Sequence, residues 1–263
     1  MPCTLLDIEK LQVSDLAPLE GMKLTSFSMR NCENVVDLAP IEGMKLTTMS
    51  FVGCKKLKSL APLRGMKLTL LDLDTCLEIS DLSPLQGMPI NHLDLRGCGR
   101  VTDLSPLKGM PLTRLHCDST KVVDLSPLKD LKLTSLSCVN TPVFDLAPLK
   151  GMKLKELNCM DAKVADLSPL QGMPLTTLNL HRCEEVKDLA PLKGMPLKWL
   201  RVDGCKKLSD VSPLEGMKLE ILHFSSTVSK GLDGVRTMSS LKTINDRPAA
   251  QFWKEHDAAK GKK

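Results

Sequence analysis

One phrase recurs along nearly the whole chain: Asp-Leu-Ser/Ala-Pro-Leu-x-Gly-Met, with small variations. Its aspartates are Asp15, Asp37, Asp81, Asp103, Asp124, Asp145, Asp166, Asp188 and Asp210, and Ser59 takes the one substituted slot. Successive slots are 22 residues apart, except for three steps of 21 residues between Asp103 and Asp166. Self-similarity at such a period is typical of solenoids, in which each unit is one supersecondary element. A chain of 263 residues can therefore be one stack of units rather than several globular domains.

Each unit also has a strand pattern before the recurring phrase. In residues 112–117, Leu115 and Cys117 are apolar at alternating positions, which predicts a strand with one buried face. The same pattern predicts eleven strands and a further half-unit at Leu241. The strands are expected to begin at Cys3, Leu24, Leu46, Leu68, Ile90, Leu112, Leu133, Leu154, Leu175, Leu197 and Leu219.

The recurring phrase itself predicts a single helical turn. In the unit at Ser105 we expect the serine as N-cap, Pro106 at the first helical position and Gly109 as the left-handed exit. One turn is too short for a full α-helix, so a 3₁₀-like turn is expected. No unit can bury its leucines alone, so neighbouring units must stack, with a parallel sheet on one side and the turns on the other.

The pattern Leu-x-x-Leu-x-Leu-x-x-Cys/Thr-x-x-Val, followed by Asp-Leu-Ser-Pro-Leu, resembles the leucine-rich repeat. It is similar to the short 22-residue subclass found in bacterial internalins and in protein-phosphatase regulatory subunits. The resemblance covers roughly residues 3 to 244. It implies an α/β solenoid, a leucine-rich-repeat horseshoe with a parallel concave sheet and short 3₁₀-like convex turns.

The two ends of the chain differ in sequence. After Thr227 the phrase breaks down, so we expect the repeat array over residues 1–227 and a C-terminal half-repeat with a capping helix over residues 228–263. Residues 248–256 are expected to form that helix, with Phe252 and Trp253 covering the last core layer. At the other end, Met1 runs almost directly into the first strand, with no cap.

The ten cysteines follow the repeat. Some cysteines recur at the turn position of successive repeats, and others recur at the last core position of the strand. Cys3 takes the first core position. Neighbours stacked about 4.8 Å apart are farther than the roughly 3.8 Å between Cβ atoms that a disulfide prefers. A zinc site would need converging ligands, whereas these lie in a line. We interpret the cysteines as buried free thiols, which favours a reducing compartment.

Charge and hydropathy exclude several classes of partner. The net charge of +5 comes from 36 basic and 31 acidic residues spread along the chain, so no nucleic-acid footprint follows. No stretch approaches the roughly 18 apolar residues of a membrane span, and the N-terminus has no signal-peptide pattern. We therefore expect a cytoplasmic monomer that needs no cofactor and no metal.

The residues between the strand leucines must face the concave side of the sheet. Polar residues gather there, and neighbouring strands in register give one row of Asp72, Asp94 and His116 and another of Asp74, Arg96 and Asp118. We predict a partner-binding surface made of Asp72, Asp74, His92, Asp94, Arg96, Arg114, His116, Asp118, Trp199, Arg201 and Asp203. The alternative is that these residues only solvate the sheet and neutralise one another. A catalytic or metal site is a third interpretation, which lacks an enclosed pocket, a nucleophile and an oxyanion hole.

Trp199 is expected on the same face, beside Ile221 and Arg201. Solvation does not favour a tryptophan, and an exposed aromatic beside an arginine is typical of an interface anchor. Alternatively, Trp199 packs on Ile221 and on the C-terminal cap.

The sequence contains no phosphate-binding glycine loop, no Gly-x-Ser-x-Gly elbow and no kinase signature. It therefore favours a non-enzymatic protein–protein interaction scaffold that binds a protein partner on the concave sheet. An alternative rests on residues 243–254, which resemble the tail of repeat arrays attached to planctomycete-type bacterial serine/threonine protein kinases. That resemblance implies a ligand-sensing or targeting module of a kinase whose catalytic domain is not in this chain.

Overall fold

The computed structural model describes residues 4–260 and, for Lys260, only the backbone. Its contacts divide it into two compact units that meet between Pro142 and Val143, and each is described by itself. The division falls inside the expected array of residues 1–227, whose separation from residues 228–263 stays a prediction. The expected strand start at Cys3 lies outside the described residues.

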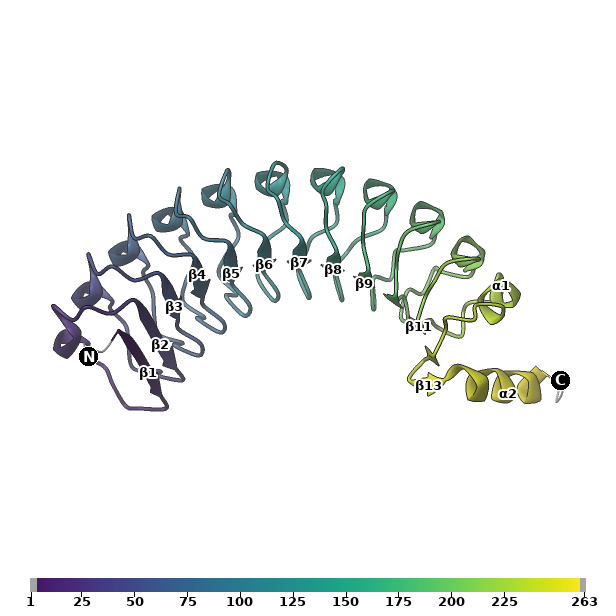
Figure 1. The fold of residues 1–263 in the computed structure, drawn as a ribbon, viewed down its shortest axis with the longest axis horizontal. Helices are drawn as coiled ribbons and strands as arrows, with labels where there is room; N and C mark the ends of the chain where they lie inside the picture. The colour runs from purple at the N-terminus through teal and green to yellow at the C-terminus, as the bar shows by residue number, and fades with distance from the viewer. Residues whose placement is uncertain (1–3, 261–263) are drawn as a thin grey trace. The chain divides into compact units, whose positions relative to one another are not determined.

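The first unit is a parallel sheet in which strands follow one another in chain order, with one 3₁₀ helix between each pair (Figure 1). Its described strands are β1 (Leu5–Glu9), β2 (Ser26–Arg30), β3 (Thr48–Ser50), β4 (Leu70–Asp72), β5 (His92–Asp94), β6 (Arg114–His116) and β7 (Ser135–Ser137). The 3₁₀ helices are η1 (Ala17–Leu19), η2 (Ala39–Ile41), η3 (Ala61–Leu63), η4 (Ser83–Leu85), η5 (Ser105–Leu107) and η6 (Ser126–Leu128).

The second unit repeats this plan and then departs from it. Its parallel strands are β8 (Glu156–Asn158), β9 (Thr177–Asn179), β10 (Trp199–Arg201), β11 (Ile221–His223) and β12 (Thr243–Ile244), and β13 (Arg247–Pro248) is antiparallel to β12. Its helices are η7 (Ala147–Leu149), η8 (Ser168–Leu170), η9 (Ala190–Leu192), η10 (Ser212–Leu214), α1 (Leu232–Arg236) and α2 (Ala249–Lys260). The sequence did not predict α1. This helix forms after the recurring phrase has ended, and it packs against η10.

The strands begin about two residues after the expected positions. Leu24 is buried as expected, but Thr25 and Ser26 both donate their N–H groups to the carbonyl of Thr4, and the regular ladder starts only at Ser26. The first leucine of each repeat is therefore a core residue that precedes the strand. The side-chain alternation is unaffected, because it depends on the register and not on the strand end.

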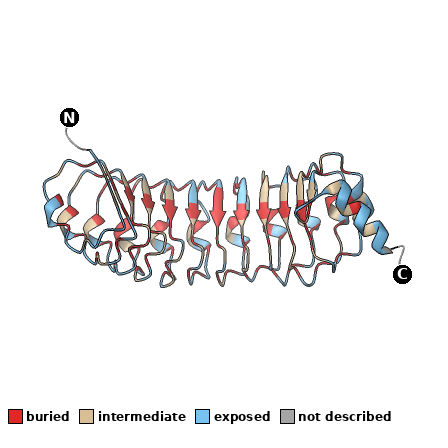
Figure 2. Ribbon diagram, turned by 90° about the horizontal axis from the view of Figure 1, so that it is seen from below, coloured by how far each residue is buried: buried red, intermediate tan, exposed pale blue. Residues whose placement is uncertain are grey.

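The core of each unit lies between the strands and the 3₁₀ helices, and within each unit Figure 2 shows buried positions on neighbouring strands. Leu71, Leu93 and Leu115 are directly paired across β4, β5 and β6, and each is completely buried. Burial of one leucine side chain contributes about 1.5–3 kcal/mol. The stacking of such layers is therefore what fixes the register of the open side of the sheet.

The prediction that Ser105 is the N-cap is wrong. Leu104 occupies the N-cap position of η5, and its side chain makes no capping hydrogen bond. Instead, Asp103 accepts the backbone N–H of Ser105 at 2.7 Å and the Ser105 hydroxyl at 2.6 Å. At Ala147, which has no hydroxyl, the N–H still donates to Asp145 at 2.8 Å. The recurring aspartate is therefore the cap, because its side chain reaches the free amide two residues ahead.

The turn exit and the cysteines agree with expectation. Gly109 has a positive φ of 73°, the left-handed conformation that favours glycine. The nine described cysteines are buried thiols, while Cys3 lies outside the described residues. Cys98 donates its thiol to the carbonyl of Leu73 at 3.2 Å, and burial raises its pKa to about 12. A thiol that stays protonated is a core residue rather than a nucleophile.

At the C-terminal end, α2 begins at Ala249, and Pro248 belongs to β13 rather than to the helix. Trp253 is buried, and the ring of Phe252 lies 5.7 Å from that of Phe224, edge to face. Both aromatic residues expected in the cap therefore pack onto the unit. Of the helices in residues 4–260, none combines the length and the apolar character that a membrane crossing requires.

Candidate functional site

The strand side chains that point away from the core form a surface that we call the open face. In the first unit this face carries the eight predicted residues Asp72, Asp74, His92, Asp94, Arg96, Arg114, His116 and Asp118, which lie on β4, β5 and β6 or directly after them. The expected row is present, since Asp72 lies opposite Asp94 on the next strand, and Asp94 lies opposite His116. The structure thus brings these residues together on three neighbouring strands.

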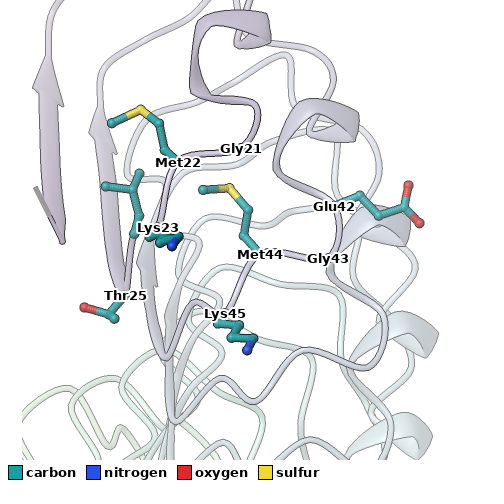
Figure 3. Close-up of a pocket in the computed structure, with 9 residues that line it drawn as sticks. Gly21, Met22, Lys23, Thr25, Glu42, Gly43, Met44 and Lys45 are labelled. Atoms are coloured by element: carbon teal, nitrogen blue, oxygen red, sulfur yellow. The ribbon is translucent and has the colours of Figure 1, made fainter. Parts of the chain in front are cut away.

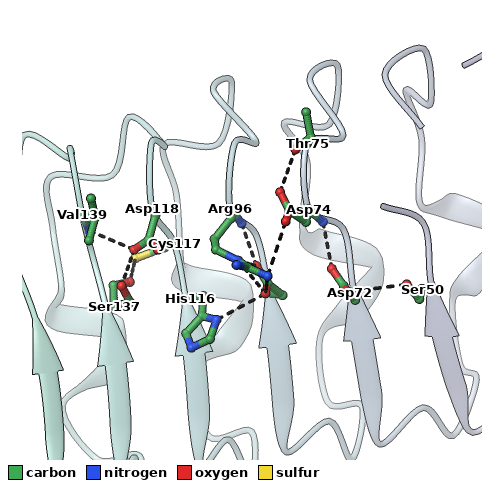
Figure 4. Close-up of polar contacts among 11 residues, drawn as sticks. Ser50, Asp72, Asp74, Thr75, Arg96, His116, Cys117, Asp118, Ser137 and Val139 are labelled. Atoms are coloured by element: carbon green, nitrogen blue, oxygen red, sulfur yellow. Dashed lines mark hydrogen bonds and ion pairs between the residues drawn. The ribbon is translucent and has the colours of Figure 1, made fainter. Parts of the chain in front are cut away.

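Asp94 is the centre of this arrangement, and Figure 4 shows two of its partners, Arg96 and His116. Its carboxylate forms an ion pair with the Arg96 guanidinium at 2.7 Å and lies 3.2 Å from Nδ1 of His116. The backbone N–H of Arg96 also donates to Asp94 at 3.0 Å. Burial alone would raise the pKa of Asp94, but the hydrogen bonds from His116 and Arg96 outweigh it and lower the pKa to about 2. Asp94 is only 3% exposed, so it positions its neighbours rather than contacting a partner itself.

The second expected row is only partly formed. Arg96 lies 3.4 Å from Asp74, but its shorter contacts are to Asp94. Asp118 instead accepts the Ser137 hydroxyl at 2.5 Å and the backbone N–H of Val139 at 2.9 Å. Sequence reasoning missed Ser137, although it holds the strand position on β7 that corresponds to His116 on β6.

Asp72 is less well compensated than Asp94. It accepts the backbone N–H of Asp74 at 3.0 Å and the Ser50 hydroxyl at 3.4 Å. Among the described residues, no cation lies within ion-pair distance of its carboxylate. Burial raises the pKa of Asp72, and repulsion from Asp94 and Asp74 adds to the effect.

The other two residues of this face differ in exposure. His92 is half-buried, with its ring 5.9 Å from that of His116 in an edge-to-face arrangement. Burial lowers the pKa of His92, as do Arg114 and His116. Arg114 is in register with His92 and is exposed. It is therefore available to a partner.

The open face of the second unit carries the remaining three predicted residues. Trp199 is half-buried, in register with Ile221, and its ring lies 6.1 Å from that of His223. Asp203 accepts from Nε of Arg201 at 2.8 Å and lies 2.8 Å from Nδ1 of His181. Burial alone would raise the pKa of Asp203, but the hydrogen bond and charge of Arg201, together with the neighbouring His181, outweigh it and hold the pKa below its usual range.

Some polar residues of the open faces have a structural role that sequence reasoning missed. Asn179 accepts the backbone N–H of His181 at 3.0 Å, and Asn158 accepts that of Met160 at 3.2 Å. Asp72 and Asp94 make the same contact two residues ahead. The signal was an Asp or Asn at the last strand position, a residue type whose side chain often bonds the backbone two residues on.

A separate groove lies away from the open face, at the turns that follow η1 and η2 (Figure 3). It has a volume of about 490 Å³ and is lined by Gly21, Met22, Lys23, Leu24, Thr25, Glu42, Gly43, Met44 and Lys45. Met22 and Met44 are partly exposed there, whereas Met88 is buried in the equivalent place. None of the predicted site residues lines this groove.

Comparisons with known proteins find similarity at the level of structure. No family model and no curated protein matches the chain. An internalin of Listeria monocytogenes, inlF, superimposes with a TM-score of 0.73 and 25% identity, over 92% of this chain and 79% of the internalin. Internalin C2 of the same species matches with a TM-score of 0.41 and 24% identity, over 76% of this chain and 71% of that one. The inlF match confirms the predicted repeat class, and the resemblance of residues 243–254 to kinase-linked arrays stays a prediction.

Proposed function

We propose that this chain, a leucine-rich-repeat solenoid of the short internalin-like subclass, is a non-enzymatic scaffold that binds a protein partner on the open face of its sheet. The similarity to an internalin supports a protein-interaction module. The observation that carries the proposal is the ordered network of Asp94, Arg96 and His116 on the open face of the first unit.

That network suits recognition because its side chains are held in place before a partner arrives. Arg96 is fixed by Asp94 through its backbone N–H and its guanidinium, yet its side chain remains 45% exposed. Fixing a long side chain costs about 0.5–1.5 kcal/mol on association, and here most of that cost falls on folding instead. A partner carboxylate or carbonyl would meet a guanidinium that is already oriented.

The second unit offers a different kind of contact. Trp199 is half-buried beside His223, and Arg201 is oriented by Asp203. Tryptophan and arginine are the residue types that most often dominate binding energies at protein interfaces. Trp199 and Arg201 are therefore the candidate anchors of this unit.

A pull-down with single-residue variants tests the proposal. Arg114→Ala and Trp199→Ala should each weaken retention of the partner by more than about 1 kcal/mol in binding free energy, while the melting temperature stays nearly unchanged. Lys108→Ala and Lys150→Ala, next to η5 and η7 on the opposite side, are the controls and should change little. If the lysine variants lose the partner and the open-face variants retain it, recognition takes place on the other side of the sheet.

A further inference from the structure

Charge is distributed unevenly over the molecule. The open face around β4, β5 and β6 carries four carboxylates against two guanidinium groups: Asp72, Asp74, Asp94, Asp118, Arg96 and Arg114. With neutral histidines this face is net negative by two charges, although the whole chain has a net charge of +5. The open face of the first unit is therefore an acidic surface on a basic protein, which favours a partner segment of positive charge.

Within this surface the negative charge is not evenly compensated. Asp94 is paired with Arg96 and His116, and Asp74 lies 3.4 Å from Arg96 and accepts the Thr75 hydroxyl at 2.7 Å. Asp72 has two hydrogen bonds and no cation within ion-pair distance among residues 4–260. A half-buried carboxylate beside two others is costly to keep ionised, and its raised pKa reflects that cost. A cation supplied by a partner would remove the imbalance.

The surroundings of Asp72 include an apolar floor. Leu70 lies two residues earlier on β4, so its side chain is on the same open face, and it is half-buried there. Its neighbours in the register are Thr48 on β3 and His92 on β5. Lysine and arginine place an aliphatic stem on apolar surface and keep the charged group at a polar one. A leucine beside an uncompensated carboxylate offers both surfaces within one strand.

We propose that Leu70 and Asp72 together receive a lysine or arginine side chain from an extended basic segment of the partner protein. This inference rests on the proposed function and specifies the chemistry of the partner. The stem of the partner's side chain lies over Leu70, and its ammonium or guanidinium group pairs with Asp72. Arg96, just after β5, and Arg114, on β6, both lie on the same side of β4 and disfavour a second cation there, so the segment carries separated rather than clustered basic residues.

The test selects binders from a library of random heptapeptides displayed on phage, with three forms of the full chain as bait. They are the wild type, Asp72→Asn and Asp130→Asn. The asparagine at 72 keeps the shape and an acceptor for the Asp74 N–H while it removes the charge. Asp130 is exposed, outside the open face, and provides the matched control. Melting curves of all three establish that each bait is folded.

The wild type and Asp130→Asn should enrich peptides with a lysine or arginine. The best of these should bind Asp72→Asn roughly tenfold more weakly, a factor that corresponds to about 1.4 kcal/mol. Peptides that bind the open face without a basic residue, or that bind Asp72→Asn equally well, overturn this inference and leave the proposed function standing. The proposed function fails separately, if the partner in the pull-down is retained equally well by Arg114→Ala and Trp199→Ala.

Discussion

Aspartate has three different roles in this chain, and its surroundings decide which one each residue has. Asp103 is exposed and caps a 3₁₀ helix, Asp94 is buried and holds the side chains of Arg96 and His116, and Asp72 is half-buried without a cation. The sequence predicts that Asp72 and Asp94 share a row, because alternation fixes which face a strand residue occupies. It cannot predict their different states, which depend on where the long side chain of Arg96 turns.

The low pKa of Asp94 makes its contribution to stability depend on pH. A carboxyl whose pKa is depressed on folding stabilises the protein above its unfolded-state pKa of about 3.9, and that contribution is lost as the pH falls through about 2. We expect Asp94→Asn to lower the free energy of unfolding by on the order of 2 kcal/mol at pH 7. Urea unfolding at several pH values should show the gap to the wild type closing between about pH 4 and pH 2. A gap that is the same at pH 7 and pH 2 contradicts this role.

Among the elements, each repeat combines a strand and a 3₁₀ turn. The sequence predicts the strand and the turn, but not which residue caps the turn. The phrase Asp-Leu-Ser-Pro suggests serine as the cap, because serine before proline is a common helix start. The structure assigns this role to the preceding aspartate, and the substituted slot provides independent support. There Ser59 accepts the N–H of Ala61 at 3.1 Å through its hydroxyl, so the slot needs a short acceptor rather than a charge.

The C-terminal helix is expected to stabilise the last repeats of the second unit. Removal of residues 245–263 deletes α2 with Phe252 and Trp253, and leaves Phe224 without its ring contact. Burial of the two aromatic side chains contributes several kcal/mol, at roughly 25 cal/mol per Å² of apolar surface. The truncated protein should melt at a lower temperature and self-associate in sedimentation experiments, because its last leucine layer is exposed. An unchanged melting temperature together with a monomeric truncated chain would contradict a capping role.

At the scale of the whole molecule, the period alone predicts most of the architecture. Leucines every 21 or 22 residues can be buried only by stacking, and stacking in register brings residues 72, 94 and 116 side by side. The period could not predict features that depend on particular side chains, or features that form where the repeat ends. The contacts of Arg96 and His116 with Asp94 are of the first kind. Helix α1, which forms after the phrase ends, is of the second.

If a partner binds the open face, footprinting of the complex will locate it there. A photoactivated carbene labels exposed side chains in the free protein and in its complex with the partner recovered by pull-down, and mass spectrometry locates the labels. We predict that binding protects Leu70 and His92 in the first unit and Trp199 in the second. Val36 and Phe144, which are 47% and 59% exposed and lie just before two of the capping aspartates, should remain labelled. Protection of Val36 and Phe144 with unchanged labelling of Leu70, His92 and Trp199 would contradict it.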